Sequence, residues 1–314
     1  MNKAAQLLKD WMLPGALLLG TGTYLLYHFS LPGLHTAGPW LHPLVSEGQL
    51  VGISFLLFFQ FVKISPHDLK FSKWHVGALA IQISLFLGLA FIIRLLAPGV
   101  SRTLLECAML CFICPTASAA GVITDRLGGN LAATVTYLVM INVTATFLIP
   151  LVIPLVNPSE NLGFWLYVGQ IALKIFPVLI LPGLVAWLIR YTCPRLQRRM
   201  MRWAPNSFYI WGVCLTLAMI LAARAMVFSG LGLWAFACIV GVSLLCCAFQ
   251  FFFGRRIGAQ TAGQALGQKN TGFLIWLGYN YLTPVTSVAG GLYAIWQNLY
   301  NSWELYRKEH PKTT

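Results

Sequence analysis

The sequence predicts an all-α integral membrane protein, with ten transmembrane helices arranged as two inverted five-helix repeats in which helices four and nine are discontinuous. Three observations lead to this prediction. The 314-residue chain is 58% apolar and 9% charged, with a mean hydropathy of +0.73, whereas soluble domains carry about 25% charged residues. Apolar stretches long enough to cross a bilayer recur along the chain. Two of them are interrupted by glycine, proline and hydrogen-bonding residues.

The ten apolar stretches are separated by short polar segments. A helix needs about 20 apolar residues to cross the hydrocarbon core. We place the spans at residues 11–30, 48–65, 76–97, 101–125, 130–156, 163–190, 206–228, 231–253, 258–281 and 284–305. Five spans in each half, residues 1–156 and 157–314, make the two halves enter the membrane from opposite sides, as in an inverted repeat. Ten spans without symmetry are the alternative, because no strong residue-level repeat is visible.

The basic residues predict the orientation. The net charge of +13 lies at the ends of apolar spans, which the positive-inside rule explains without nucleic acid. With the N-terminus in the cytoplasm, the cytoplasmic side holds Lys3, Lys9, Lys63, Lys70, Lys73, Arg126, Arg190, Arg195, Arg198, Arg199, Arg202, Arg255, Arg256, Arg307, Lys308 and Lys312. The outer side holds only Arg94 and Arg102. We therefore expect a multi-pass protein of the plasma or inner membrane with both termini in the cytoplasm.

Both interruptions fall where a smooth helix would be expected. The first contains Cys114-Pro115-Thr116-Ala117-Ser118, and the second is Gly267-Gln268-Lys269-Asn270-Thr271-Gly272. Free backbone groups at membrane depth are tolerated only where protein or a watery cavity covers them. A pair of interruptions in matching places of two halves indicates the binding site of a transporter. The polar candidates for that site are Thr116, Ser118, Gln268, Asn270 and Thr271, although each could equally satisfy the backbone of its own break.

These motifs resemble those of the bile acid:sodium symporter superfamily of secondary transporters. The second interruption is similar to the family's Gly-x-Gln-Asn-Ser-Gly, and Thr116-Ala117-Ser118 is similar to its Gly-Gly-Thr-Ala-Ser-Asn. Gly129-Asn130 opens the fifth span, and Pro284 with the segment 290–298 resembles the family's last span. The resemblance implies a core domain of spans 3–5 and 8–10 and a panel domain of spans 1–2 and 6–7, with the two broken helices crossing near the midplane.

The sequence departs from the family where the family binds sodium. The resemblance implies an Asn ligand at the position of Ala119, a bridging acidic residue at the position of Ala265, and a supporting Gln at the position of Lys269. Gln82 matches a family glutamine near the second sodium site. Sodium prefers oxygen ligands, so the loss of a carboxylate and the gain of an ammonium both disfavour it.

Lys269 is therefore the central candidate residue. Its ammonium could replace the bound cation permanently, or it could couple protons to transport by gaining and losing a proton. The alternative is a structural lysine paired with backbone carbonyls of the break. Helix ends at a broken span add partial positive charge, so the site favours an anion, with Ala119 and the polar candidates beside it.

Glu106 is the only acid well inside a span. We expect it to form a structural ion pair with Lys174 or Arg224, which also lie toward the outer ends of their spans; a proton relay is the alternative. Cys107, Cys111 and Cys114 share one helix face, and small residues at a helix interface explain them better than a metal site. No phosphate loop, nucleotide motif or nucleophile–base pair is present, so we expect no cofactor and no enzyme activity.

The sequence thus predicts a secondary transporter of an organic anion, bile-acid-like or a small carboxylate or sulfonate, that works by alternating access. Sodium is doubtful as a partner and protons are the alternative coupling ion. Gln82, Lys269 and Glu106 are the candidate ion-coupling residues. One alternative is a sodium-coupled symporter with rearranged ligands, namely Gln82, Ser118, Asn270 and backbone carbonyls. Another is a membrane receptor that binds the same ligand without moving it.

Overall fold

The protein is all-α, as the sequence predicts. A computed structural model describes residues 12–310, and within that range no strand occurs apart from one isolated bridge between Thr116 and Lys269. Six helical stretches of this range are long and apolar enough to cross a membrane. The start of the first predicted span, with Lys3, Lys9 and Lys312, lies outside the described residues.

The helices follow the predicted spans in order. In the first half they are α2 (Met12–Ser30), α3 (Gly38–Val62), α4 (Lys73–Arg94), α5 (Val100–Ile113), α6 (Ala120–Arg126) and α7 (Leu131–Val156). In the second half they are α8 (Phe164–Leu179), α9 (Leu181–Thr192), α10 (Pro194–Trp203), α11 (Ser207–Phe228), α12 (Leu233–Gly267), α13 (Thr271–Tyr281) and α14 (Ser287–Glu309). The 3-10 turns are η1 (Pro32–Ala37), η2 (Pro66–Asp68), η3 (Ala204–Asn206) and η4 (Pro284–Thr286).

Two boundaries differ from the prediction. The second span was placed from residue 48, but α3 begins at Gly38. Glu47 lies within this helix, and its carboxylate pairs with Lys174 of α8 at 2.5 Å. No span was placed between residues 190 and 206, and this basic connection contains the separate helix α10.

Spans eight and nine meet in a reversal inside α12. Gly258 (φ −156°, ψ 32°) and Ala259 (φ 52°, ψ −146°) are non-helical, so the chain turns back and its two arms pack together. A Cβ on Gly254 would lie 2.5 Å from the carbonyl oxygen of Ala262, and a Cβ on Gly267 would lie 2.4 Å from the ring of Phe251. Glycine at these positions therefore permits the close approach.

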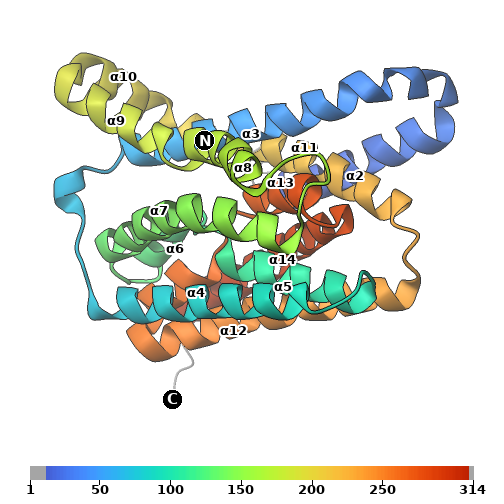
Figure 1. Ribbon diagram of the computed structural model, residues 1–314. Helices are drawn as coiled ribbons and strands as arrows, with labels where there is room; N and C mark the ends of the chain where they lie inside the picture. The colour runs from blue at the N-terminus through green and yellow to red at the C-terminus, as the bar shows by residue number, and fades with distance from the viewer. Residues whose placement is uncertain (1–11, 311–314) are drawn as a thin grey trace.

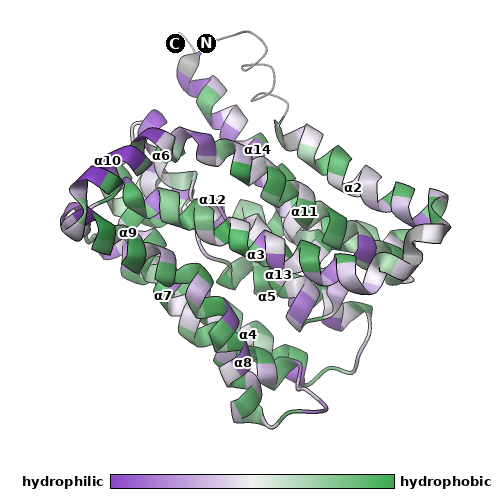
Figure 2. Cartoon of the chain, turned by 90° about the horizontal axis from the view of Figure 1, so that it is seen from above, coloured by the Kyte–Doolittle hydropathy of each residue, from purple (hydrophilic) through white to green (hydrophobic). Residues whose placement is uncertain are grey.

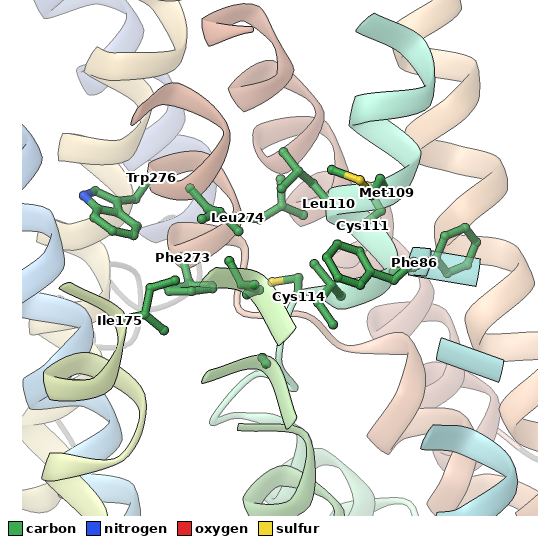
Figure 3. Close-up of a cluster of buried hydrophobic side chains, with 14 of the residues drawn as sticks. Phe86, Met109, Leu110, Cys111, Cys114, Ile175, Phe273, Leu274 and Trp276 are labelled. Carbon is green, nitrogen blue, oxygen red and sulfur yellow. The ribbon is translucent and has the colours of Figure 1, made fainter. Parts of the chain in front are cut away.

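The helices pack as two groups (Figure 1). In the first group, α2 and α3 pack on α11, and α8 and α9 pack on α3. In the second, α4 packs on α5 and α7, while α12 packs on α4, α5, α6 and α14. The groups meet where α11 contacts α13 and α14, where α3 contacts α13, and where α7 contacts α8. The apolar cluster at the centre takes side chains from both groups, including Phe86, Cys114, Ile175 and Trp276 (Figure 3).

Hydrophilic residues gather on α10, near α6 and at the end of α14 (Figure 2). The ends of α6 and α14 are joined, because the Lys308 ammonium donates to the carbonyl of Arg126 at 2.6 Å. Most of the remaining helix surface is apolar, including exposed Leu19, Phe91 and Leu173. A belt of exposed apolar side chains bounded by basic residues is the surface expected of a protein within a bilayer.

We predict that Gly254→Ala destabilises the reversal. The new Cβ would clash with the backbone of Ala262, which cannot move as a side chain can, and overpacking of this kind costs about 1–3 kcal/mol. Gly241→Ala, in the same helix with nothing within 4 Å of its Cβ, is the matched control and is expected to be neutral or stabilising. Thermal unfolding in detergent measures both. Equal stability of the two variants would contradict the packing of the α12 arms.

Candidate functional site

The first break separates α5 from α6. Pro115 has no N–H and disfavours a helical conformation at the residue before it, and Cys114 accordingly has ψ of 130°. The second break separates α12 from α13, where Gln268 is extended (φ −84°, ψ 119°). Asn270 then starts α13 as its N-cap, since its side-chain oxygen accepts from the N–H of Phe273 at 3.3 Å. Both breaks lie within the segments that the sequence marked.

The two breaks satisfy each other's backbone groups. The N–H of Ala117 donates to the carbonyl of Gln268 at 3.0 Å, and the N–H of Asn270 donates to the carbonyl of Pro115 at 2.8 Å. The thiol of Cys114 donates to the carbonyl of Asn270 at 3.1 Å. Segments about 150 residues apart in the sequence therefore form one short two-stranded contact, and neither break can be changed without affecting the other.

Glutamine side chains from two further helices add to this hydrogen bonding. Gln297 of α14 accepts from the N–H of Lys269 at 2.8 Å and donates to its carbonyl at 3.3 Å. Gln49 of α3 donates to the carbonyl of Gly272 at 2.6 Å. The sequence analysis assigned no role to either residue, although a glutamine inside an apolar helix is itself a signal of a buried polar partner.

Gln82 lies at the first break. Its amide nitrogen donates to the carbonyl of Phe112 and, at 3.4 Å, to that of Cys114, while its oxygen accepts from the hydroxyl of Tyr137. The side chain is fully engaged in holding the C-terminal end of α5 and does not line the cavity described below. Its amide oxygen is therefore committed to a protein partner.

Lys269 is fully buried, and its ammonium Nζ has no hydrogen-bond partner within residues 12–310. Its electrostatic neighbours are the thiols of Cys111 and Cys114 on α5 and of Cys246 and Cys247 on α12. Figure 3 shows Cys111 and Cys114 among the side chains of the apolar cluster. The last turn of α5 and the end of α12 at Gly267, two residues before Lys269, both bear the partial negative charge of a helix C-terminus, which favours a cation.

A cavity of about 430 Å³ opens beside the breaks. Its wall on the break side includes Ser118, Ala119, Gln268, Lys269, Asn270 and Thr271. The opposite wall comes from α3 and α11 and is mainly apolar, with Ile53, Leu57, Phe208 and Trp211, and Lys63 lies at the end of α3. A cavity of this size with one polar and one apolar wall has the form of a small-molecule site.

The structure thus brings together six of the seven predicted substrate-binding residues. Thr116 is the exception: it is fully buried and its hydroxyl donates to the carbonyl of Ala265 at 2.7 Å, so it braces the two breaks. Within this set Lys269 has no exposed surface, so its charge would act on a ligand through the wall of the cavity rather than by direct contact.

Glu106 does not have the predicted partner. Its carboxylate pairs with Arg102 one turn earlier at 3.1 Å and accepts from the N–H of Thr283 at 3.2 Å. Lys174 pairs instead with Glu47, and Arg224 donates to the hydroxyl of Tyr279. The prediction of a Glu106 pair with Lys174 or Arg224 is wrong because an arginine four residues away on the same helix is nearer. Glu106 lies outside the cavity lining.

The three thiols of α5 are buried and free. Cys107, Cys111 and Cys114 pack against the core of the second helix group. Over the part of the chain that the structure describes, no group of three or more His, Cys, Asp or Glu side chains is placed to hold a metal ion.

The comparisons with known proteins identify the family. The profile of the Sodium Bile acid symporter family matches residues 50–229, which is more than half of the chain. This chain belongs to that family. It is a multi-pass membrane transporter of the bile acid symporter type rather than an enzyme. No curated protein matches it. The matched segment contains the first break but not the second, so the departures at Ala265 and Lys269 lie beyond it.

We predict that the break side of the cavity is open to water at Ala119. In a background with Cys193→Ser and Cys238→Ser, Ala119→Cys should react with a small water-soluble thiol reagent at least about tenfold faster than Ala120→Cys. Ala119 is exposed and lines the cavity, whereas its neighbour Ala120 has no exposed surface. Equal rates, measured by mass spectrometry on the purified protein, would place the cavity elsewhere.

Proposed function

We propose that this transporter moves an amphipathic or small organic anion by alternating access, without sodium, and that the ammonium of Lys269 takes the place of a bound cation. The observation that carries the proposal is the position of Lys269. Its amine is buried beside the C-terminal end of α5, in the break that lines the cavity, and no carboxylate lies near it.

The architecture we propose is that of ten spans in two inverted repeats. The halves would be residues 1–156 and 157–314, with α5–α6 and α12–α13 as the discontinuous crossing helices. The packing supports the proposed domains, because α4 to α7 pack with α12 to α14, and α2, α3, α8, α9 and α11 pack with one another. The cavity then lies between the core and panel domains, where transporters of this kind bind substrate.

The basic residues support cytoplasmic termini. Lys63 and the segment Ala204–Pro205, which follows α10, lie on the cavity wall. They belong to the basic end of the molecule, so the cavity would open toward the cytoplasm. The outer halves of the two groups are held together instead, by Ser46 with Asn280 at 3.1 Å and by Arg224 with Tyr279. This arrangement corresponds to an inward-open state.

Several side chains that would be needed to bind sodium are absent or occupied. Ala119 and Ala265 supply no side-chain oxygen. Two of the rearranged ligands of the alternative symporter are also engaged, because Gln82 is bonded to Tyr137 and Asn270 caps α13, whereas Ser118 lines the cavity. An ammonium within about 4 Å of a sodium ion would repel it by about 4 kcal/mol at an effective dielectric of 20, which equals the whole binding energy of a millimolar site.

An anion fits the charges around the cavity. The N-terminal end of α13 contributes partial positive charge, and Ser118, Thr271 and Asn298 supply polar groups. The apolar wall of α3 and α11 suits the hydrophobic part of an amphipathic anion such as a bile acid. Transport could be driven by coupling to protons, through Lys269 or through Glu106. Lys269 is the favoured coupling residue because it adjoins the cavity.

We predict that sodium does not stabilise the protein. A site with a millimolar dissociation constant would add about 2.7 kcal/mol of stability at a hundredfold excess of sodium. Thermal unfolding of the purified protein should therefore be the same in about 100 mM NaCl, KCl or choline chloride. A saturable stabilisation by sodium over potassium would restore the symporter alternative.

Restoring the family residues should restore sodium binding. We predict that the double variant Ala265→Glu, Lys269→Gln gains sodium-dependent stabilisation, because it returns the carboxylate and removes the competing ammonium. The single variant Lys269→Gln is the control and should gain little, since no carboxylate is added. If both variants remain folded and neither is stabilised by sodium, the residues at positions 265 and 269 are not the cause of the lost sodium binding.

We also predict that anions, not cations, stabilise the protein, and that Lys269→Gln weakens this effect. Taurocholate, a small dicarboxylate and a cationic amphiphile serve as probes in thermal unfolding and in flux into proteoliposomes. A charge that acts through the cavity wall, about 8–12 Å from the anion at an effective dielectric of 20, contributes about 1–2 kcal/mol, so the anion affinity should fall about fivefold to thirtyfold in the variant. Binding without flux would indicate a receptor.

An imposed pH gradient that drives flux only with Lys269 intact would assign the coupling proton to it.

A further inference from the structure

The helix α10 (Pro194–Trp203) has no role in the transport mechanism proposed above. Four arginines lie on it at helical spacing: Arg195, Arg198, Arg199 and Arg202. Because residues three, four and seven positions apart share one side of a helix, these four form a single arginine face. All four are exposed, and none has an ion-pair or hydrogen-bond partner among residues 12–310.

The rest of α10 fixes how this face is directed. Gln197 donates to the carbonyl of Val62 at 3.3 Å, and Met200 packs against the central core, so this side of α10 rests on the protein. The arginine face lies on the opposite side. Between the two, Leu196 and Trp203 are 41% and 60% exposed, so an apolar flank stays uncovered.

α10 thus has an arginine face, an apolar flank and a side that rests on the protein. These are the features of a helix that lies in a membrane interface. An amphipathic helix rich in arginine, with tryptophan and leucine on its apolar side, binds at the boundary between headgroups and acyl chains. The neighbouring helix α9, which α10 contacts, also leaves Leu188 and Tyr191 exposed. The arginine face would then lie among the headgroups.

We propose that α10 is a binding site for anionic phospholipid headgroups. Arginine carries a planar fork of donors that pairs with phosphate, and four unpaired guanidiniums on one face complement a layer of negative headgroups. The positive-inside rule explains why basic residues lie on one side of the membrane. It does not explain their restriction to one face of an amphipathic helix.

The site adjoins the transport cavity. Ala204 and Pro205, directly after α10, line the cavity, and Val62, which receives the hydrogen bond from Gln197, precedes the cavity residue Lys63. Arg190 of α9 donates to the same Val62 carbonyl at 3.3 Å. A lipid held by α10 would therefore be bound next to the cavity entrance.

The test is a lipid titration of the purified full chain in neutral detergent. Short-chain phosphatidylglycerol is added, and the half-maximal concentration for thermal stabilisation is measured, with phosphatidylcholine and inorganic phosphate as separate arms. The test variant changes all four arginines of α10 to glutamine. The matched control removes four exposed charges elsewhere at the basic end of the molecule: Lys70→Gln, Lys73→Gln, Arg126→Gln and Arg307→Gln.

A basic residue near an anionic surface contributes about fivefold to binding, so the half-maximal concentration should rise at least tenfold in the α10 variant. In the control variant it should rise no more than about twofold. Equal losses of affinity in the two variants would overturn the proposal, and so would equal stabilisation by phosphatidylcholine. Displacement of the lipid by millimolar phosphate would also overturn it, because it would indicate a site for free anions.

A second measurement covers a test variant that fails to fold. The variant with four Arg→Lys changes on α10 keeps the charge but loses the planar fork, so its half-maximal concentration should rise less than that of the glutamine variant. A fluorophore on Cys193, the exposed thiol between α9 and α10, should respond to phosphatidylglycerol and not to phosphatidylcholine in a Cys238→Ser background. No response at Cys193 would show that the stabilising lipid binds elsewhere and would overturn the proposal.

Discussion

The hydrogen bonds between the two broken helices are the interaction on which the rest of the site depends. Each break releases backbone N–H and carbonyl groups at membrane depth, where water reaches only the side that faces the cavity, and a group left unpaired in hydrocarbon costs several kcal/mol. The protein meets this constraint by pairing one break with the other, through Ala117 with Gln268 and Asn270 with Pro115. The glutamines of three neighbouring helices then satisfy what remains. The break side of the cavity wall is therefore held by hydrogen bonds although it contains no continuous helix.

The same constraint explains which parts of the structure the sequence could predict. Pro115 and the glycines around Lys269 interrupt apolar segments, so both breaks are visible without a structure. The composition likewise determines the all-α class. The pairing of Glu106 with Arg102 could also have been expected, because these residues lie four apart on one helix. The helical spacing of the arginines in α10 was a comparable signal.

Other features depend on side chains that are far apart in the sequence. The apolar surroundings of the Lys269 amine come from α5 and α12, and no local pattern states that four thiols meet there. The reversal at Gly258 and Ala259 requires Gly254 and Gly267 on the two arms at once. The sequence shows each of these residues separately, but which ones become neighbours is decided by how the helices pack.

The distribution of polar contacts between the two helix groups indicates which end must rearrange during transport. Gln49 bonds to Gly272, Ser46 to Asn280 and Arg224 to Tyr279, and all three pairs link α3 or α11 to α13. The Ser46 and Arg224 pairs lie away from Lys63, at the end of the interface that the cavity does not reach, whereas the Gln49 bond adjoins the cavity, because Gly272 is on its wall. If the groups move as proposed, these hydrogen bonds must break for the other side to open. Because Gln49 bonds to the first turn of α13, the closed end is directly connected to the second break, and a ligand that moves this break would weaken the contact that keeps that end closed.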